Sequence, residues 1–295
     1  MTRYEPAIDL DAITAIDVHV HIEVDGHGHA SLPEDLAAGA AEYFSTDGPN
    51  PDLDSVAEYY RERRMAAVVF TVDAETQLGH APLSSAEIAE GAARNNDALI
   101  PFGSVDPRRP DALDRVRRLI DENGVRGFKF HPTVQGFDPS DEAHFPLYEV
   151  LQEAGVVALF HTGQTGIGAG LPGGRGLLLG LSNPMLLDPV AARFPELQII
   201  MAHPSVPWQD EALSVATHKH NTWIDLSGWS PKYFPESLVR AANSYLKKRV
   251  LFGSDFPLLT PDRWMRDAET MGSFKPEVLP GILKDNAARL LGLGG

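Results

Sequence analysis

Histidine and acidic side chains stand at the ends of several short apolar runs in this chain of 295 residues. The first run carries Asp17, His19 and His21 at every second position, and strand alternation would direct all three side chains to one face. Later runs end in His161, in His203 and in Asp255. Buried polar groups of this kind cost about 1–3 kcal/mol each unless they are hydrogen-bonded or bound to a cation. The residue types therefore predict a site for a divalent ion, with Zn²⁺ as the first choice and Mn²⁺ as the alternative.

The composition restricts both the site and its partners. The chain has no cysteine, so the ligands of any metal ion must be His, Asp or Glu. It has 25 basic and 41 acidic residues and a formal net charge of −16, which repels phosphate backbones and anionic lipid headgroups. No apolar run reaches the length of about 18 residues that a membrane span needs. We expect a cytoplasmic protein that acts on a small molecule and binds neither nucleic acid nor membrane.

Eight strand-length apolar runs position these side chains. They are rich in Val, Ile, Leu and Phe with little alternation, as in parallel strands buried on both faces. The runs span residues 15–22, 65–72, 100–105, 126–131, 156–162, 198–204, 222–228 and 250–257. Their alternation with helical segments predicts a single α/β domain over residues 1–295, a (β/α)₈ TIM barrel. The alternative is an open doubly wound sheet, but no GxGxxG motif follows the first run.

Helical spacing fills the intervals between the runs, and several segments begin with proline near the first turn. The predicted helices span residues 51–64, 84–98, 110–123, 145–154, 184–194, 208–218, 235–248, 261–271 and 277–291. Residues 23–50, after the first strand, are predicted to form a long lid-like loop without regular structure. In this loop His27 and His29 are interpreted as ordinary loop residues, and His218 and His220 as groups at a helix end.

The Asp-x-His-x-His run, taken with His161, His203 and the Ser254-Asp255 pair, resembles the amidohydrolase superfamily. The resemblance is to its amidohydrolase-related branch, which includes aminocarboxymuconate-semialdehyde decarboxylase and related metal-dependent hydrolases of TIM-barrel fold. It extends over residues 15–291 and implies an enzyme, with a homodimer as the expected assembly. It further implies that one metal ion is bound by His19, His21, His161 and Asp255, with His203 as the acid/base beside the activated water.

The neighbouring strand ends supply further candidates. Asp17 is predicted to orient a histidine of the first strand rather than to bind the metal. Lys129 ends the fourth strand, where superfamily members with two metals often carry a carbamylated bridging lysine. Because the related branch usually works with one metal, we expect one ion per chain and a Lys129 that holds a substrate carboxylate or carbonyl. His131, on the same face, either lines the pocket or bonds a loop.

Three residues in loops are predicted to contact the substrate. Arg175 lies in a glycine-rich segment after the fifth strand and is a candidate anion clamp. Trp208 and Trp229 follow the sixth and seventh strands, and they either wall the pocket or pack against its support.

Two reactions suit this set of residues. In a hydrolase, activated water attacks a carbonyl of an ester, amide, lactone or β-dicarbonyl compound, with His203 and Asp255 as the acid/base groups. In a non-oxidative decarboxylase, the same groups protonate an aromatic or conjugated acid that loses CO₂. The likeness of the Gly-Phe-Lys-Phe-His-Pro and His-Thr-Gly strand ends to hydrolases of the branch favours hydrolysis. A non-catalytic, metal-stabilised binding barrel is the remaining alternative.

Overall fold

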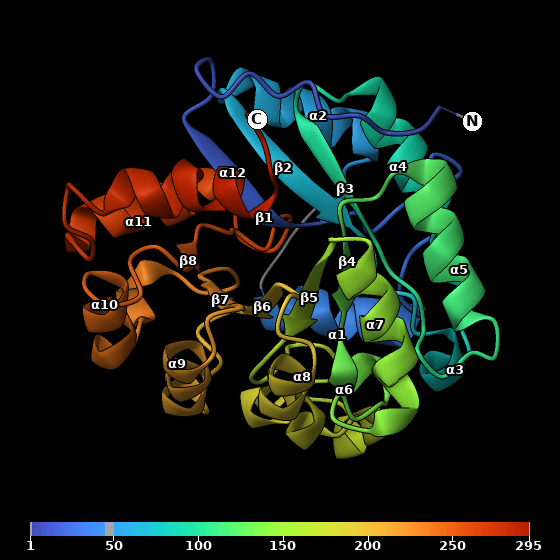
Figure 1. The fold of residues 1–295 in the computed structure, drawn as a ribbon. Coiled ribbons are helices and arrows are strands. Elements are labelled where there is room, and N and C mark those ends of the chain that lie inside the picture. The colour runs from blue at the N-terminus through green and yellow to red at the C-terminus, as the bar shows by residue number, and fades with distance from the viewer. Residues whose placement is uncertain (1, 45–49, 295) are drawn as a thin grey trace.

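The protein folds as a barrel of eight parallel strands with helices on its outside (Figure 1). The structure is a computed structural model that describes residues 2–44 and 50–294. Each strand pairs with the next along the chain. The strands are β1 (Ala15–His21), β2 (Met65–Phe70), β3 (Leu99–Gly103), β4 (Gly127–Phe130), β5 (Val157–His161), β6 (Ile199–Ala202), β7 (Thr222–Asp225) and β8 (Val250–Leu251). The predicted TIM barrel is confirmed, and all eight strands lie within the predicted runs to within one residue.

Backbone hydrogen bonds along and beyond the short β8 close the barrel against β1. The Val18 N–H donates to the Phe252 carbonyl at 3.1 Å, and the His21 N–H donates to the Phe256 carbonyl at 2.8 Å. The predicted strand 250–257 is regular only over Val250–Leu251, because the backbone of Asp255 turns into the left-handed region at a φ of 74°. The seam between the first and last strands therefore passes through the residues that carry the predicted site.

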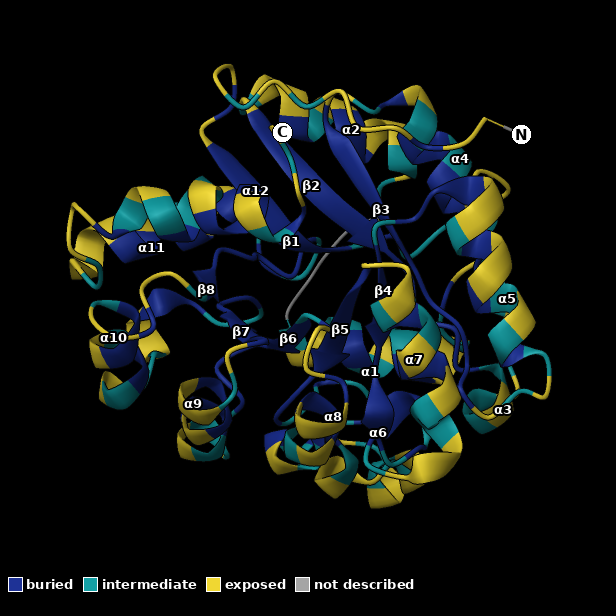
Figure 2. Cartoon of the chain, in the orientation of Figure 1, coloured by how far each residue is buried: buried dark blue, intermediate teal, exposed yellow. Residues whose placement is uncertain are grey.

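Helices cover the outer face of the barrel, and their buried sides face the strands (Figure 2). The helix α11 coincides with the predicted segment, whereas most of the others are shorter than predicted; parts of some predicted segments, such as residues 119–123 and 184–187, form π or 3₁₀ turns instead. The helices are α1 (Glu34–Phe44), α2 (Leu53–Glu62), α3 (Glu75–Leu78), α4 (Ser85–Arg94), α5 (Ala112–Arg118), α6 (Pro132–Gln135), α7 (Phe145–Glu153), α8 (Asp188–Arg193), α9 (Gln209–His218), α10 (Glu236–Ala242), α11 (Pro261–Met271) and α12 (Asn286–Leu290).

The segment after β1 differs from the prediction of an irregular loop, because it contains α1. This helix buries Leu36 and Ala40, which are spaced by one helical turn, and carries Glu34 and Asp35 in its first turn, where acidic groups favour the helix dipole. Residues 45–49 of the predicted lid-like loop lie outside the described residues.

The apolar core has two layers separated by the strands. The inner layer fills the barrel below the site and includes Ile16, Val18, Val68, Phe70, Leu159 and Ile200. The outer layer packs between strands and helices and includes Val20, Val69, Phe128, Phe160, Met201 and Phe252. Alternation along each strand produces this division.

A β-bulge in β1 changes which side chains face the barrel interior. The register of β1 against β2 shifts between Asp17 and Val20, so that Val18 and His19 both lie inside. The prediction that Asp17 shares a face with His19 and His21 is therefore wrong, because a bulge interrupts the two-residue period. The two histidines contact the ring of Phe70 in the barrel interior.

Asp17 instead points outward and joins three structural elements. Its carboxylate accepts a hydrogen bond from the Tyr60 hydroxyl of α2 at 2.7 Å and another from the Ser254 N–H at 2.9 Å. The His19 backbone N–H also donates to it, at 3.1 Å, but no histidine ring does so. The prediction that Asp17 orients an imidazole is thus wrong: it holds β1, α2 and the segment after β8 together.

Among the described residues, no helix combines the length and the apolar character that crossing a membrane requires.

Candidate active site

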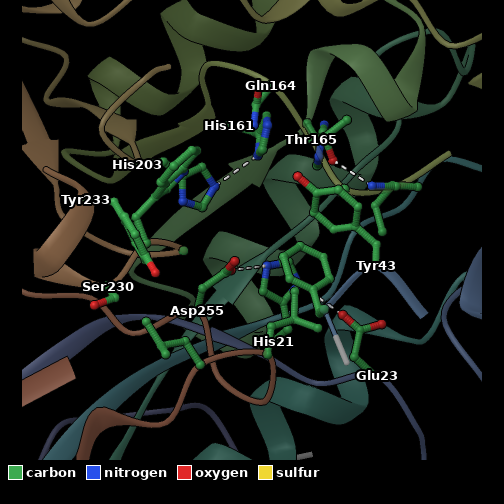
Figure 3. Close-up of a pocket in the computed structure, with 18 of the residues that line it drawn as sticks. His21, Glu23, Tyr43, His161, Gln164, Thr165, His203, Ser230, Tyr233 and Asp255 are labelled. Carbon is green, nitrogen blue, oxygen red and sulfur yellow. Dashed lines mark hydrogen bonds and ion pairs between the residues drawn. The ribbon is translucent and has the colours of Figure 1, made fainter. Parts of the chain in front are cut away.

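Three acceptor atoms converge at the C-terminal mouth of the barrel. His19 Nε2 and His21 Nε2 lie 3.2 and 3.3 Å from Asp255 Oδ1, and 3.3 Å from each other. The three side chains come from β1 and from the segment after β8, on the two sides of the barrel seam. Figure 3 shows Asp255 and His21 facing one another on the floor of the pocket.

Two further carboxylates hold the opposite nitrogens of these imidazoles. Asp225, the last residue of β7, lies with its Oδ2 atom 2.9 Å from His19 Nδ1. Glu23 lies with its Oε1 atom 3.1 Å from His21 Nδ1. A carboxylate can only accept, so both Nδ1 atoms carry a proton, and in the neutral imidazoles the Nε2 atoms are left as the acceptors that a cation would bind.

The sequence analysis missed Asp225 and Glu23. Asp225 ends the observed strand β7 but lies in the middle of the predicted run 222–228, so the criterion of a strand end, which identified His161 and His203, did not point to it. Glu23 lies two residues beyond His21, and its contact depends on the path of the loop after β1, which the sequence does not determine.

His203 and His161 form a second pair beside the three acceptors. The Ser227 carbonyl oxygen lies 3.1 Å from His203 Nδ1, so the proton of this ring is on Nδ1 and its Nε2 atom accepts. His161 Nδ1 lies 3.0 Å from that atom and must donate to it. His161 Nε2 is then a bare acceptor, and within the described residues it is buried without a hydrogen-bond partner.

Lys129 lies beneath the cluster rather than in the pocket wall. Its side chain is fully buried, its Nζ atom is 3.1 Å from His19 Nε2, and it stands over the Phe70 ring. Burial lowers the pKa of Lys129 to about 8, although the charges of Asp255 and Asp225 favour the ammonium form.

The electrostatics of the cluster favour a positive charge between its acceptors. Burial opposes protonation of His21, but hydrogen bonds to Asp255 and Glu23 outweigh it and raise the pKa of His21 to about 9. The same contacts hold the pKa of Asp255 far below its usual value despite its burial. Burial lowers the pKa of His203, which keeps this imidazole neutral.

Two site residues have strained backbones. His203 and Asp255 adopt φ values of 68° and 74°, a left-handed conformation that side-chain-bearing residues adopt at a cost of about 1–3 kcal/mol. Gly228, with a φ of 73°, lies against both, because a Cβ atom there would be 2.7 Å from His203 Nδ1 and 3.1 Å from Asp255 Oδ2. A residue without a side chain is required for this close approach.

A pocket of about 340 Å³ opens above the cluster (Figure 3). His21, His161, His203 and Asp255 form its floor. Its remaining walls are Glu23, Tyr43, Phe44, His131, Gln164, Thr165, Gly166, Ile167, Gly228, Trp229, Ser230, Tyr233, Leu258, Leu259 and Arg263. The volume suits a small organic molecule, and the aromatic walls suit a planar one.

The structure places some of the predicted substrate-binding residues elsewhere. His131 lines the pocket and stacks on His161 with ring centroids 3.8 Å apart, and Trp229 also lines it. Arg175 lies outside the pocket wall, where its Nε atom is 2.6 Å from Asp35 Oδ2 of α1, and Trp208 precedes α9 outside the wall as well.

The remaining histidines lie away from the cluster. His27 borders a separate hollow near α4, and His29 stacks on His80 in the next loop. His218 ends α9, as expected for a group at a helix end.

The donor set fits a divalent metal ion. Ligand atoms bound at about 2.0–2.1 Å in a tetrahedron lie about 3.3 Å apart, which matches the spacing of the His19, His21 and Asp255 acceptors. His203 provides an alternative third ligand, since His19, His203 and Asp255 place one ligand atom each within 4.8 Å of the others. The bare Nε2 atom of His161 is a buried polar group of the kind that an ion would satisfy.

Eight parallel strands that alternate with outer helices define a TIM barrel, and enzymes of this fold carry their active sites at the C-terminal mouth, where this chain has its imidazole and carboxylate groups. A family model described as amidohydrolase matches residues 16–293, and the chain belongs to this amidohydrolase family. Comparison with curated proteins gives no match.

Solved structures share the fold over nearly the whole chain. An uncharacterized TIM-barrel protein from Bordetella bronchiseptica has a TM-score of 0.74 at 22% identity, covering 94% of this chain and 98% of that one. A dihydroxybenzoic acid decarboxylase from Polaromonas, with bound manganese and the inhibitor 2-nitroresorcinol, has a TM-score of 0.66 at 16% identity, covering 96% and 98%. A probable 2-pyrone-4,6-dicarboxylic acid hydrolase from Acinetobacter baumannii, with citric acid bound, has a TM-score of 0.61 at 15% identity, covering 95% and 100%. Such low identities establish a common fold and leave the reaction open.

Proposed function

We propose that the protein is a metal-dependent hydrolase that directs water at a carbonyl group of a small ester, amide, lactone or β-dicarbonyl compound. The observation that carries the proposal is the meeting of His19, His21 and Asp255 acceptors within 3.2–3.3 Å of one another, with His21 and Asp255 lining a pocket and His19 buried behind them. These residues, with His161, would hold one ion, for which the two imidazoles and one carboxylate favour Zn²⁺, with Mn²⁺ as the alternative.

A bound ion would supply Lewis acidity, which polarises a carbonyl and makes water a better nucleophile. His203 supplies the proton transfer. Its Nδ1–H is held by the Ser227 carbonyl, so Nε2 is its basic nitrogen. To take a proton from the attacking water and return it to the leaving group, this atom would have to give up the hydrogen bond that it accepts from His161 Nδ1–H. Its lowered pKa keeps it in the basic form at neutral pH.

The pocket walls contribute binding and shielding. Tyr43 and Phe44, at the end of α1, stand over the same pocket as His203 and Asp255. Covering the floor with aromatic rings excludes bulk water and strengthens the electrostatic interactions beneath them.

Decarboxylation of an aromatic acid is the second candidate. The flat walls formed by Tyr43, Phe44, Trp229 and Tyr233 favour it, because they suit a planar ring. Structures with this fold are named as decarboxylases, among them the protein from Polaromonas. In this reaction His203 would first have to take up a proton on Nε2 and then deliver it to the ring carbon that bears the carboxylate; the bond between that carbon and the carboxylate breaks, CO₂ leaves, and the electron pair of the broken bond restores the ring.

The test is turnover by the zinc-loaded protein of a panel of esters, lactones, amides, β-diketones and carboxylated aromatics, with released acid and CO₂ both measured. His203→Ala is expected to lower turnover about 10²–10⁴-fold, as for loss of an acid/base group, while elemental analysis still finds one metal equivalent per chain. His218→Ala, at the exposed end of α9, is the matched control and keeps full activity.

Each outcome has a distinct meaning. Stoichiometric CO₂ without hydrolysis would replace the proposal by the decarboxylase. Two metal equivalents would contradict the single-ion site, and normal turnover by the His203 variant would remove the role given to that residue. Metal binding with no turnover on any member of the panel would favour a non-catalytic binding barrel.

A further inference from the structure

The charges of the pocket are unevenly placed. Its floor carries the carboxylate of Asp255, and Glu23 adds another acidic group to its wall. Among the described residues that line the pocket, Arg263 carries the guanidinium group, and no lysine accompanies it.

Arg263 lies at the mouth rather than on the floor. It belongs to the first turn of α11, and 56% of its side chain is exposed, against 9% for Asp255. Leu258 and Leu259, just before α11, lie in the same wall and provide an apolar surface between the mouth and the floor.

Within the part of the chain that the structure describes, the guanidinium of Arg263 makes only a long ion pair. Its closest acidic partner is Asp267, one helical turn away, with a separation of 3.9 Å between Nε and Oδ2. That carboxylate already accepts from the Ser230 hydroxyl at 2.7 Å and pairs with Lys232 at 3.0 Å. Arg263 can therefore offer its donors to a ligand without leaving a buried acid unpaired.

We propose that Arg263 binds a carboxylate of the substrate at the pocket mouth, while the group that reacts lies on the floor beside His203 and Asp255. The substrate is then a small organic carboxylate with a hydrolysable carbonyl at its other end. This inference rests on the proposed function and deepens it, because a carboxylate held at the mouth is not the one that would leave as CO₂. It also gives Arg263 the anion-binding role predicted for Arg175, whose side chain pairs with Asp35.

The test measures how much the metal-binding end and the carboxylate end of a ligand each contribute to binding. Monohydroxamates of the linear dicarboxylic acids from succinic to suberic acid carry a metal-binding group at one end and a carboxylate at the other. Uncharged alkanohydroxamates of matching length carry the first group alone. Binding of both series to the zinc-loaded full-length protein is measured by titration calorimetry, and the range of lengths removes any assumption about the span of the pocket.

At the probe length that spans from the metal ion to Arg263, the carboxylated hydroxamate should bind about tenfold more tightly than the uncharged hydroxamate of the same length, which corresponds to about 1.4 kcal/mol of binding free energy. Arg263→Gln should abolish this preference and leave the binding of alkanohydroxamates unchanged. Arg263→Lys should retain part of it, because an ammonium keeps the charge but not the two-pronged geometry. Arg266→Gln is the matched control: Arg266 is on the same helix, lies 3.9 Å from the same Asp267 and is absent from the pocket wall.

The outcomes distinguish this inference from the function on which it rests. If alkanohydroxamates bind in a zinc-dependent manner but no carboxylated probe is preferred, the role of Arg263 is refuted and the metal site stands. An equal loss of preference in the Arg266 variant would likewise refute it, since a general surface charge would then explain the effect. If no hydroxamate binds the zinc-loaded protein, both proposals fail.

Discussion

Replacing Asp225 by Asn tests the carboxylate that holds His19. Asp225 Oδ1 accepts from the Ser227 N–H at 2.9 Å and the His203 N–H at 3.2 Å, so an asparagine must keep its carbonyl oxygen on that side. Its NH₂ group would then face His19 Nδ1–H, and two donors would oppose each other. To relieve this, the His19 ring must carry its proton on Nε2 or rotate, and in both cases a metal ligand is lost.

The expected cost follows from this change of tautomer. Loss of a partner behind a metal-binding histidine lowers metal affinity about 10–100-fold, or about 1.4–2.7 kcal/mol. We expect the variant to fold, because the two amide hydrogen bonds to Oδ1 are retained. Zinc affinity is measured by competition with a chromophoric chelator, and folding by circular dichroism of the metal-free protein.

Asp106→Asn is the matched control for this experiment. Asp106 is also fully buried and contacts no histidine, but it accepts backbone hydrogen bonds through both oxygens, Oδ2 from Thr76 at 2.8 Å and Oδ1 from Arg108 at 2.9 Å. An asparagine at position 106 keeps only one of these bonds, so this variant loses at least as much structural support as the Asp225 variant and controls for it. The zinc affinity of the Asp106 variant should equal that of the wild type. An Asp225 variant that is folded and binds zinc as tightly as the wild type would refute the tautomer argument and the assignment of His19 as a ligand.

Three further predictions concern other parts of the structure. Glu23→Gln should lower zinc affinity by about tenfold, at the lower end of the range expected for Asp225, because the Glu23 side chain is partly exposed. The same competition assay measures this, and an unchanged affinity would count against the role of Glu23 in holding His21. Gly166→Ala should displace the aromatic wall of the pocket, because the added Cβ would lie 2.5 Å from the Phe44 ring and 2.8 Å from the Tyr43 ring. We expect this variant to bind alkanohydroxamates more weakly. Gly180→Ala is the control and should bind them normally, because a Cβ at Gly180 would have no neighbour within 4 Å. Hydrogen bonds from Arg115 and Arg109 lower the pKa of Asp111 to about 2, so its stabilising contribution should be complete above its usual pKa of about 4 and disappear as the pH falls through about 2. Denaturation of wild type and Asp111→Asn over that range checks this, and a difference that persists at the lowest pH would contradict it.

The barrel was predictable because its strands are buried on both faces. Runs such as residues 156–162 are apolar up to the His161 and Thr162 that end them, which is the pattern of a parallel strand buried on both faces. The side chains at strand ends were predictable for the same reason, since parallel strands bring their C-terminal ends to one mouth.

The failures come from features that depend on distant contacts. The bulge that separates Asp17 from His19 arises in the pairing of β1 with β2, and local alternation carries no sign of it. The helix α1 was missed because only Leu36 and Ala40 are buried on it and because it contains Gly39, a residue type that disfavours helices. The pairing of Arg175 with Asp35 joins the segment after β5 to α1, far away in the sequence, and only the tertiary fold reveals that this arginine is already engaged.

The position of the acceptor cluster at the seam of the barrel has a consequence for assembly of the chain. His19 and His21 belong to the first strand, whereas Asp255 follows the last one, and β8 itself is only two residues long. A cation bound by these side chains would link the first strand of the barrel to the segment after the last one. Its complete site forms only after the C-terminal segment has docked, so tight binding of the ion would mark a late stage of folding.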